Sequence, residues 1–365
     1  MKNKLNINFN KQLGVSLIEL MIAMIIGLIL TGGAIQIFIS SKATYRLETA
    51  LSRLQETGRF IIDNMSREIR MTGYTGCSSR GTIEVNVISR NPTPVTFDAD
   101  NAILGFNGGA GAWTPAIPAN LLIAMTDIDG DNTKDVIDGT DVVNVQRMDE
   151  CGAAIVGNWE TTNAQMNVSH PNTCTFDQNE TVMVTDCRNA DVFQITNTPN
   201  TSGNQQNLAH STAVNTGNFL GQNYGPDSQI SKPRSKIFFI APGDSGEPAF
   251  YVASWEPNDG DANLTADDYV IMELADGVED MQSLYGVDTG GGDAYADSYV
   301  TADNVTDWID VKSARINLLL RSDDRITEEP RSVTFNGAAV NSGAGADQRL
   351  RMVYSTTISL RNRLP

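Results

Sequence analysis

The chain has 365 residues, of which 44 are acidic and 26 are basic, and its formal net charge is −18. An acidic surface of this size repels phosphate groups, so it argues against general binding of nucleic acid by the folded part of the chain. Hydrophobic residues make up 41% of the composition, which excludes a wholly disordered chain and allows a packed core.

The first element is an apolar run that follows a short basic leader. The leader ends at Gly14, and the run at 15–39 would be roughly 37 Å long as a helix, enough to cross a bilayer. One carboxylate, Glu19, interrupts the run, and an isolated charge in hydrocarbon costs roughly 2.5–3.5 kcal/mol. A secretory signal would instead place a shorter apolar stretch before its cleavage site. An ordinary signal anchor remains the alternative.

Three lysines precede the span and indicate its orientation. They are Lys2, Lys4 and Lys11. Under the positive-inside rule they hold the N-terminus in the cytoplasm, so the bulk of the chain lies outside the inner membrane.

The junction LGVSLIELM resembles the type IV prepilin signal. This resemblance implies that a prepilin peptidase cuts between Gly14 and Val15 and that the new N-terminal residue, Val15, is N-methylated. Glu19 then occupies mature position five. A carboxylate buried among packed helices can pair with the free amine of Val15 in a neighbouring subunit, so Glu19 is the expected assembly residue. A helix-end side chain that reaches the membrane interface is the alternative.

The helical pattern continues beyond the span and becomes amphipathic. Apolar or small residues recur at steps of three and four, at Leu47, Leu51, Leu54, Gly58, Ile61, Met65 and Ile69. This spacing predicts one helical face packed against the rest of the chain, with Gly73 ending the helix. We therefore expect a cleaved leader at 1–14, a transmembrane half at 15–39, an amphipathic extracytoplasmic half at 40–72 and a head at 73–365.

The head is expected to be rich in strands, which gives an α+β fold with a long N-terminal helix. Alternating β-branched and aromatic residues predict strands at Ile83–Ile88, Asp141–Met148, Thr181–Asp186, Asp191–Thr196, Lys236–Ala241, Ala249–Trp255, Lys312–Arg321 and Arg349–Leu360. Loop-rich insertions are expected near 91–120 and 197–231, where Pro, Gly, Asn and Ser accumulate.

All four cysteines lie beyond the membrane segment, at Cys77, Cys151, Cys174 and Cys187. An even count in an oxidising compartment indicates two disulfides, with three possible pairings. Cys174–Cys187 together with Cys77–Cys151 is the favoured pairing. A zinc site is the rival interpretation, but no CxxC spacing supports it.

An acidic segment, TDIDGDNTKDVIDG, is a candidate calcium site. Carboxylates stand at Asp127, Asp129, Asp131, Asp135 and Asp138. Hard oxygen ligands at such spacing suit Ca²⁺, although Asp138 replaces the bidentate Glu of an EF-hand loop. A solvated acidic turn is the alternative. No other cofactor is predicted.

The segment at 243–248, GDSGEP, resembles the nucleophile box of trypsin-like proteases around Ser245. That chemistry needs a histidine base, and the two histidines, His170 and His210, lie in unrelated polar segments. A turn between two strands is the favoured interpretation, and no enzymatic activity is expected.

Several blocks distributed over the chain are similar to PilW-type minor pilins. They are the N-terminal stretch up to MTGYTGC, then VMVTDCRNADVFQIT, ELADGVEDMQSLYGVD, VTDWIDVKSARINLLLRS and the terminal ISLRNRLP. The resemblance implies a minor pilin that primes assembly of the type IV pilus near its tip. It also implies a location in the inner membrane before assembly and in the surface pilus afterwards.

The partners that this resemblance implies are other minor pilins, the major pilin, a tip adhesin, the prepilin peptidase and the inner-membrane assembly platform. A minor pseudopilin of a type II secretion system is the alternative. A membrane-anchored extracytoplasmic hydrolase, based on Ser245 alone, is a more distant one.

Overall fold

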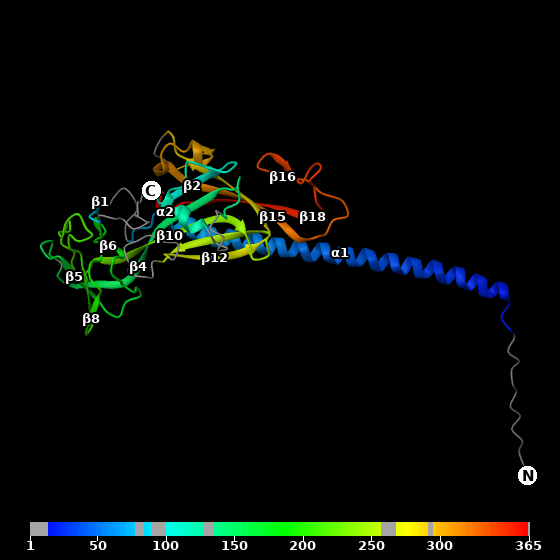
Figure 1. Ribbon diagram of the computed structural model, residues 1–365, viewed down its shortest axis with the longest axis horizontal. Coiled ribbons are helices and arrows are strands. Elements are labelled where there is room, and N and C mark those ends of the chain that lie inside the picture. Colours follow the sequence, from blue (N-terminus) through cyan, green and yellow to red (C-terminus); the bar gives the residue numbers. More distant parts are fainter. Residues whose placement is uncertain are drawn as a thin grey trace, which may run out of the picture. The chain divides into compact units, whose positions relative to one another are not determined.

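The computed structural model describes residues 14–76, 84–89, 100–126, 135–158, 160–256, 268–290 and 295–363. The chain forms two compact units, Met1–Arg53 and Leu54–Pro365. The first contains the N-terminal part of a long helix, and the second contains the rest of that helix and a head dominated by strands (Figure 1). The predicted α+β class is therefore confirmed.

The helix α1 runs without interruption over Leu17–Met71. It ends where the sequence predicts, because Gly73 adopts φ +73°, a conformation that favours glycine. The Gly73 amide then donates to the Gln146 carbonyl at 2.9 Å, which joins the end of the helix to the large sheet.

The larger sheet has twelve strands among the described residues. Its main path follows the order β1 (Glu84–Val87), β7 (Asn189–Gln194), β6 (Thr181–Thr185), β10 (Gln229–Pro242), β4 (Val142–Gly157), β5 (Gln165–Ser169), β9 (Gln205–Ala209) and β8 (Asn200–Ser202). Four strands lie off this path, namely β2 (Ile103–Gly108), β3 (Trp113–Thr114), β11 (Pro248–Trp255) and β12 (Tyr269–Asp276). The parallel pair β1–β7 is the exception in an otherwise antiparallel sheet.

The second sheet is antiparallel and follows the order β14 (Ser298–Val300), β13 (Val278–Val287), β15 (Val311–Arg325) and β18 (Arg349–Ser359). A small hairpin pairs β16 (Val333–Phe335) with β17 (Ala338–Val340). Short helical turns connect these strands, namely α2 (Ala119–Leu122), η1 (Ile123–Met125), η3 (Ala302–Asn304), η4 (Trp308–Asp310) and η5 (Arg361–Arg363).

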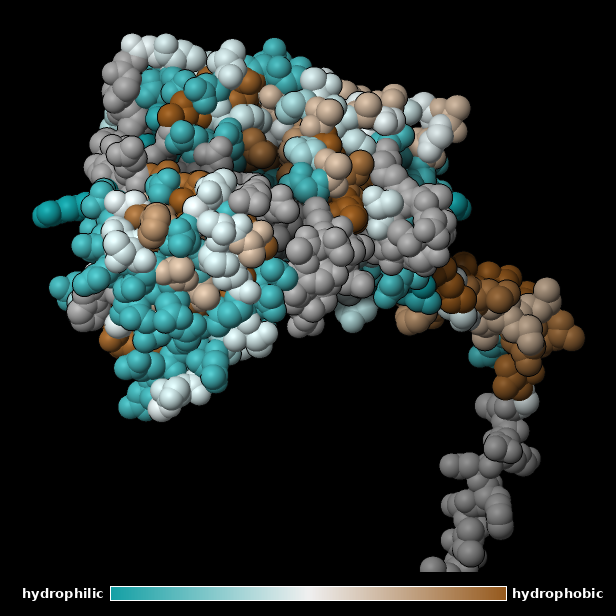
Figure 2. Space-filling model, turned by 60° about the vertical axis from the view of Figure 1, so that its left-hand side comes forward, coloured by the Kyte–Doolittle hydropathy of each residue, from teal (hydrophilic) through white to brown (hydrophobic). Residues whose placement is uncertain are grey.

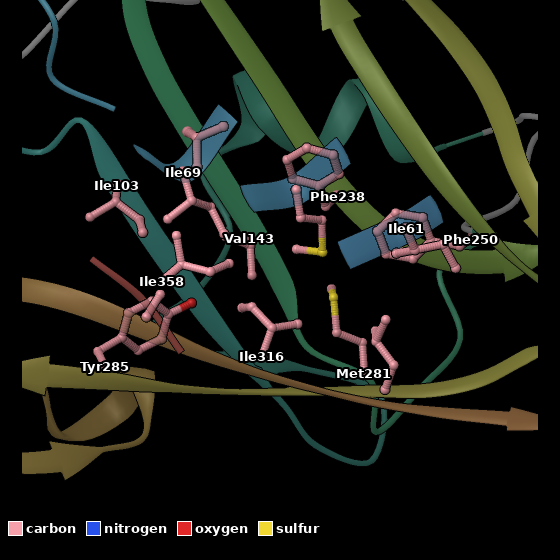
Figure 3. Packing of buried hydrophobic residues seen from close by; sticks show 14 of the residues in the cluster. Ile61, Ile69, Ile103, Val143, Phe238, Phe250, Met281, Tyr285, Ile316 and Ile358 are labelled. Atoms are coloured by element: carbon pink, nitrogen blue, oxygen red, sulfur yellow. The ribbon is translucent and has the colours of Figure 1, made fainter. Parts of the chain in front are cut away.

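The main core lies between the two sheets and the C-terminal part of α1 (Figure 3). The helix contributes Leu54, Ile61, Met65 and Ile69 to this core. Phe238 and Phe250 come from the large sheet, and the second sheet adds residues such as Ile316. The predicted apolar face of the helix is confirmed from Leu54 onward, while Leu47 and Leu51 belong to the first unit.

Further hydrophobic clusters extend the head, and two of them are large. One lies on the opposite face of the large sheet, where α2 and η1 pack Leu121 and Met125 against Phe239 and Tyr251. The other fills the part of the sheet built by β5–β9, around Phe193 and Leu208. The stretch at 197–231 supplies Leu208, Leu220 and Tyr224 to this core as well as the strands β8 and β9.

Each of the eight predicted strands is present, but several boundaries differ. The strand β4 extends to Gly157, well past the predicted end at Met148, because it pairs with β10 and β5 along its length. The strands β12 and β13 were not predicted, since acidic residues interrupt their apolar pattern.

The favoured disulfide pairing is wrong. Cys151 is bonded to Cys174, with the two Cα atoms 4.9 Å apart. Cys151 lies in strand β4, and Cys174 lies in the segment that precedes β6. The structure brings these two residues together, so Cys174 pairs with Cys151 and not with Cys187. Cys187 is also disulfide-bonded, whereas Cys77 lies outside the described residues.

Candidate assembly interface

The segment at 15–39 exposes mainly apolar side chains. Its large hydrophobic side chains are exposed from Val15 to Ile39, including Leu17, Ile25 and Phe38. Figure 2 shows this part of the chain as a brown segment, whereas the visible face of the head is largely teal and white. Helix α1 is long and apolar enough to cross a membrane. A helix that is hydrophobic all round requires lipid or other helices as its surroundings.

Glu19 lies in the first turn of α1, two residues after the helix begins. The positive end of the helix dipole favours a negative charge at this place. Among the described residues, Glu19 has no hydrogen-bond or ion-pair partner, and the surrounding side chains are apolar. Gly14 and Val15 precede the helix and are exposed. The carboxylate is therefore available to a cationic group from another molecule.

The helix is anchored to the head by a second glutamate, Glu68, which the sequence did not single out. Its side chain is buried, and its carboxylate pairs with Lys236 Nζ at 2.7 Å and with Arg147 Nε at 3.2 Å. These cations come from β10 and β4, so the ion pairs tie α1 to the centre of the large sheet. The sequence contained an indication of this role, because Glu68 lies between Met65 and Ile69 on the apolar arc of the helix, where a charged residue needs a partner.

The C-terminal segment also contacts the end of α1. Asn362 Nδ2 donates to the carbonyls of Met71 and Thr72, both at 3.2 Å, and so satisfies free carbonyls at the end of α1. On the side of β18, the Tyr354 hydroxyl donates to the Gln55 carbonyl at 3.1 Å. A Cβ at Gly58 would approach the Tyr354 ring to 2.4 Å, so only glycine allows this contact.

A buried carboxylate connects the two sheets. Asp141 accepts hydrogen bonds from the Gly108 amide at 2.9 Å and from the Ser283 amide at 2.7 Å, which belong to β2 and β13. Burial raises the pKa of Asp141 to about 7, while the two amide donors oppose this rise. Its position makes it a structural group of the head.

The predicted calcium ligands fall mainly outside the described residues. Asp127, Asp129 and Asp131 are not described, whereas Asp135 and Asp138 are. Within the described ranges, no three acidic, histidine or cysteine side chains are placed to hold a metal ion. The calcium site therefore stays a prediction.

The GDSGEP segment forms the turn between β10 and β11. The Gly243 amide donates to the Glu247 carbonyl at 2.8 Å, and the Ser245 hydroxyl donates to Asp276 at 3.4 Å. Its distinctive side chain is Glu247, which forms ion pairs with Arg321 and with Arg349 and so joins the two sheets.

Neither histidine is paired with Ser245 among the described contacts. Burial lowers the pKa of His210 to about 4, and its ring packs at a tilt against Phe193 in a different core. The arrangement of a serine protease is therefore not formed by these residues.

Comparison with known families gives two matches, one to the C-terminal part of the head and one to the N-terminal segment. Residues 237–362 match the family described as Type IV Pilus-assembly protein W, and residues 9–35 match the prokaryotic N-terminal methylation motif. No curated protein and no solved structure gave a match to the chain. The first match covers β11–β18 and the last six residues of β10, and the second covers the junction and the beginning of α1. The chain therefore has the N-terminal methylation motif of type IV prepilins and is similar to PilW-type pilus-assembly proteins over residues 237–362.

Proposed function

We propose that the protein is a minor pilin that helps to initiate assembly of the type IV pilus and lies near the tip of the filament. The observation that carries this proposal is the spacing of Gly14, Val15 and Glu19 at the start of an apolar helix. The match of residues 237–362 to the pilus-assembly family supports a pilus and not a secretion system.

Assembly depends on a charge pair that is created by proteolysis. Prepilin peptidase removes residues 1–14 and exposes the amine of Val15, which is then methylated. The uncut chain has no amine at this depth, so only the processed form offers a partner to Glu19 of a neighbouring subunit. Pairing relieves an isolated charge in an apolar environment, and loss of one partner is costly.

The orientation follows from the same segment. Lys2, Lys4 and Lys11 retain the leader in the cytoplasm, and the head enters the periplasm before assembly. The processed chain then joins other minor pilins, the major pilin and the assembly platform, and carries a tip adhesin with them.

Two measurements test this function. The intact mass of the protein from membranes should lack residues 1–14 and contain one additional methyl group. Replacement Glu19→Ala should leave membrane insertion intact but reduce pilus number and incorporation, whereas Glu48→Ala, on the same helix beyond the apolar run, should change neither. A chain that is recovered only at full length would contradict the proposal.

A deletion strain separates the remaining alternative. Loss of surface pili and of twitching motility with normal release of exoproteins is expected. The reverse pattern would identify a pseudopilin of a secretion system.

A further inference from the structure

The second sheet has a polar face on the side away from the main core. Alternate side chains of β15, such as Ile316, point into the main core, so Arg315 and Asn317 lie on the other face. Their partners across the sheet are Thr357 and Ser355 of β18, which are both exposed. This part of the sheet is therefore accessible to another molecule.

The β16–β17 hairpin limits this open area at one end. It lies near β18 (Figure 1), and Asn336 of its turn donates to Gln282 of β13 at 3.5 Å. Leu319, on the same face of β15, is only 1% exposed. The open area therefore lies farther back along β15, around Arg315 and Asn317.

The Arg315 side chain is held in place by its neighbours on this face. Its guanidinium carbon lies 4.0 Å from the centre of the Tyr299 ring, and its Nε donates to Thr357 Oγ1 at 3.2 Å. The Tyr299 hydroxyl is itself hydrogen-bonded to Ser313 Oγ at 3.0 Å. Because the guanidinium is already positioned, little side-chain ordering is needed when its Nη groups bind a partner.

Arg315 has no carboxylate partner among the described residues. By contrast, Arg321 of the same strand pairs with Glu247. Asp280 of β13 lies on the same face, but it accepts a hydrogen bond from Gln282 Nε2 at 3.0 Å. A guanidinium group with free Nη groups presents two parallel donors, which match the two oxygens of a carboxylate.

The charge of this region is opposite to that of the whole chain. Residues 311–363 include nine basic and five acidic residues, whereas the whole chain has 26 basic and 44 acidic residues. Two copies joined symmetrically through this face would bring their Arg315 side chains together, and like charges in an interface are costly. The complementary partner is an acidic surface on a different chain.

The groups around Arg315 favour a protein carboxylate over a lipid surface. Attachment to anionic lipid generally relies on a cluster of basic residues. Here the neighbouring groups are the hydroxyls of Thr357 and Ser355 and the amide of Asn317. Ser355 Oγ donates to Asn317 Oδ1 at 2.7 Å, which leaves Asn317 Nδ2 as a second donor on the face. One cation beside one amide donor fits a single carboxylate.

We propose that this face binds an aspartate or glutamate side chain on the head of another pilus subunit. The Nη groups of Arg315 donate to both carboxylate oxygens, and Asn317 Nδ2 adds a hydrogen bond at the side. This inference rests on the proposed function, because it names the kind of partner that the head contacts in the filament.

The test is a cross-link without a spacer, made on the full-length chain in membranes and in sheared pili. Arg315→Lys keeps the positive charge and introduces an amine, which a carbodiimide joins only to a carboxylate in direct contact. We expect the introduced amine to be joined to an Asp or Glu of another pilus subunit, identified by mass spectrometry of the linked peptides. Arg325→Lys, at the exposed end of the same strand, is the matched control and should give no such product.

A second pair of variants measures the effect on assembly. Arg315→Ala should lower the amount of the chain in sheared pili roughly tenfold through loss of a charged hydrogen bond, whereas Arg325→Ala should leave it unchanged. The melting temperature of Arg315→Ala shows whether its head is folded, and the cross-link decides the matter if it is not.

The outcomes separate this inference from the proposed function. A product that joins position 315 only to this same chain, to a second copy or to lipid would overturn the inference, and so would the absence of any product in pili that contain the processed chain. In those cases the proposed function still stands. A chain that keeps residues 1–14 and is absent from pili would overturn both.

Discussion

At the scale of single residues, the head depends on a few buried charged groups whose partners come from distant segments. Glu68 illustrates this most directly, because its carboxylate is shared between Arg147 and Lys236 on two strands. Replacement Glu68→Gln would remove the counter-charge of Lys236, whereas Arg147 keeps its ion pair with Asp149. We expect the free energy of unfolding to fall by up to about 3 kcal/mol, since the pair is largely buried but its cations are partly hydrated.

Chemical denaturation of the purified chain measures this change. Glu56→Gln, which alters an exposed carboxylate on the same helix, serves as the control and should shift the midpoint little. Equal midpoints for the two variants would mean that the Glu68 ion pairs contribute nothing to stability.

Asp141 gives the head a distinct dependence on pH. Its pKa in the folded chain is about 7, above the ordinary value of 3.8, so the folded state holds a proton that the unfolded state has released between these two pH values. The contribution of Asp141 to stability is therefore fully present below about pH 4 and is lost as pH rises through 7. The pKa of His210 is lowered and acts in the opposite direction between pH 4 and 6.5.

A comparison of variants isolates the contribution of Asp141. The wild-type chain should lose more stability between pH 5 and pH 8 than Asp141→Asn, whose amide does not titrate. The measurement is the midpoint of denaturation at both pH values for the two proteins. Parallel pH profiles would show that Asp141 is ionised in both states.

At the scale of elements, the second half of α1 was the most predictable part of the head. Its apolar face is a local pattern, and Ile61, Met65 and Ile69 are buried as the spacing requires. Strand β13 was missed because Glu279 and Asp280 interrupt its alternation, although pairing with β15 on one side and β14 on the other decides its structure. Pairing with distant segments also explains why β4 is so long. The local sequence pattern does not predict this length.

In the candidate site, too, local features could be predicted and contacts between distant segments could not. Gly14, Val15 and Glu19 could be predicted from the sequence because all the information for this prediction lies in one short stretch. Glu68, Glu247 and Asn362 were missed because their partners, such as Lys236, are separated from them along the chain and meet only in the folded head. The disulfide was assigned wrongly for the same reason.

Close packing between α1 and β18 predicts a specific sensitivity at Gly58. An added methyl group in Gly58→Ala would meet the Tyr354 ring at 2.4 Å, so the ring or the strand must move. Overpacking of this kind costs about 1–3 kcal/mol. Thermal unfolding should show a clearly lower midpoint for Gly58→Ala, and the additional change Tyr354→Ala should recover part of the loss.

The control for Gly58 is another glycine in the same helix. A Cβ at Gly33 meets nothing within 4 Å, so Gly33→Ala should not change the unfolding midpoint of the head. If Gly58→Ala behaves like Gly33→Ala, the close contact with Tyr354 is not a constraint on the fold.

At the scale of the whole molecule, the chain joins an apolar helix to a head that carries all four cysteines. The Cys151–Cys174 bond and the oxidised state of Cys187 require an oxidising environment, which agrees with a head outside the cytoplasm. Because the number of cysteines is even, we expect Cys77 and Cys187 to form the second pair. We therefore expect the head to lie outside the cytoplasm.

Peptide mapping without reduction tests the pairing and the orientation together. Protein taken from cells should have no thiol that alkylates before reduction, and its digest should contain a Cys151–Cys174 peptide and a Cys77–Cys187 peptide. Cys151→Ser provides the control, because it should expose one reactive thiol at Cys174 and show that the reagent reaches this site. Four reactive cysteines in the wild-type chain would place the head in a reducing compartment, and such a head could not join a filament outside the cell.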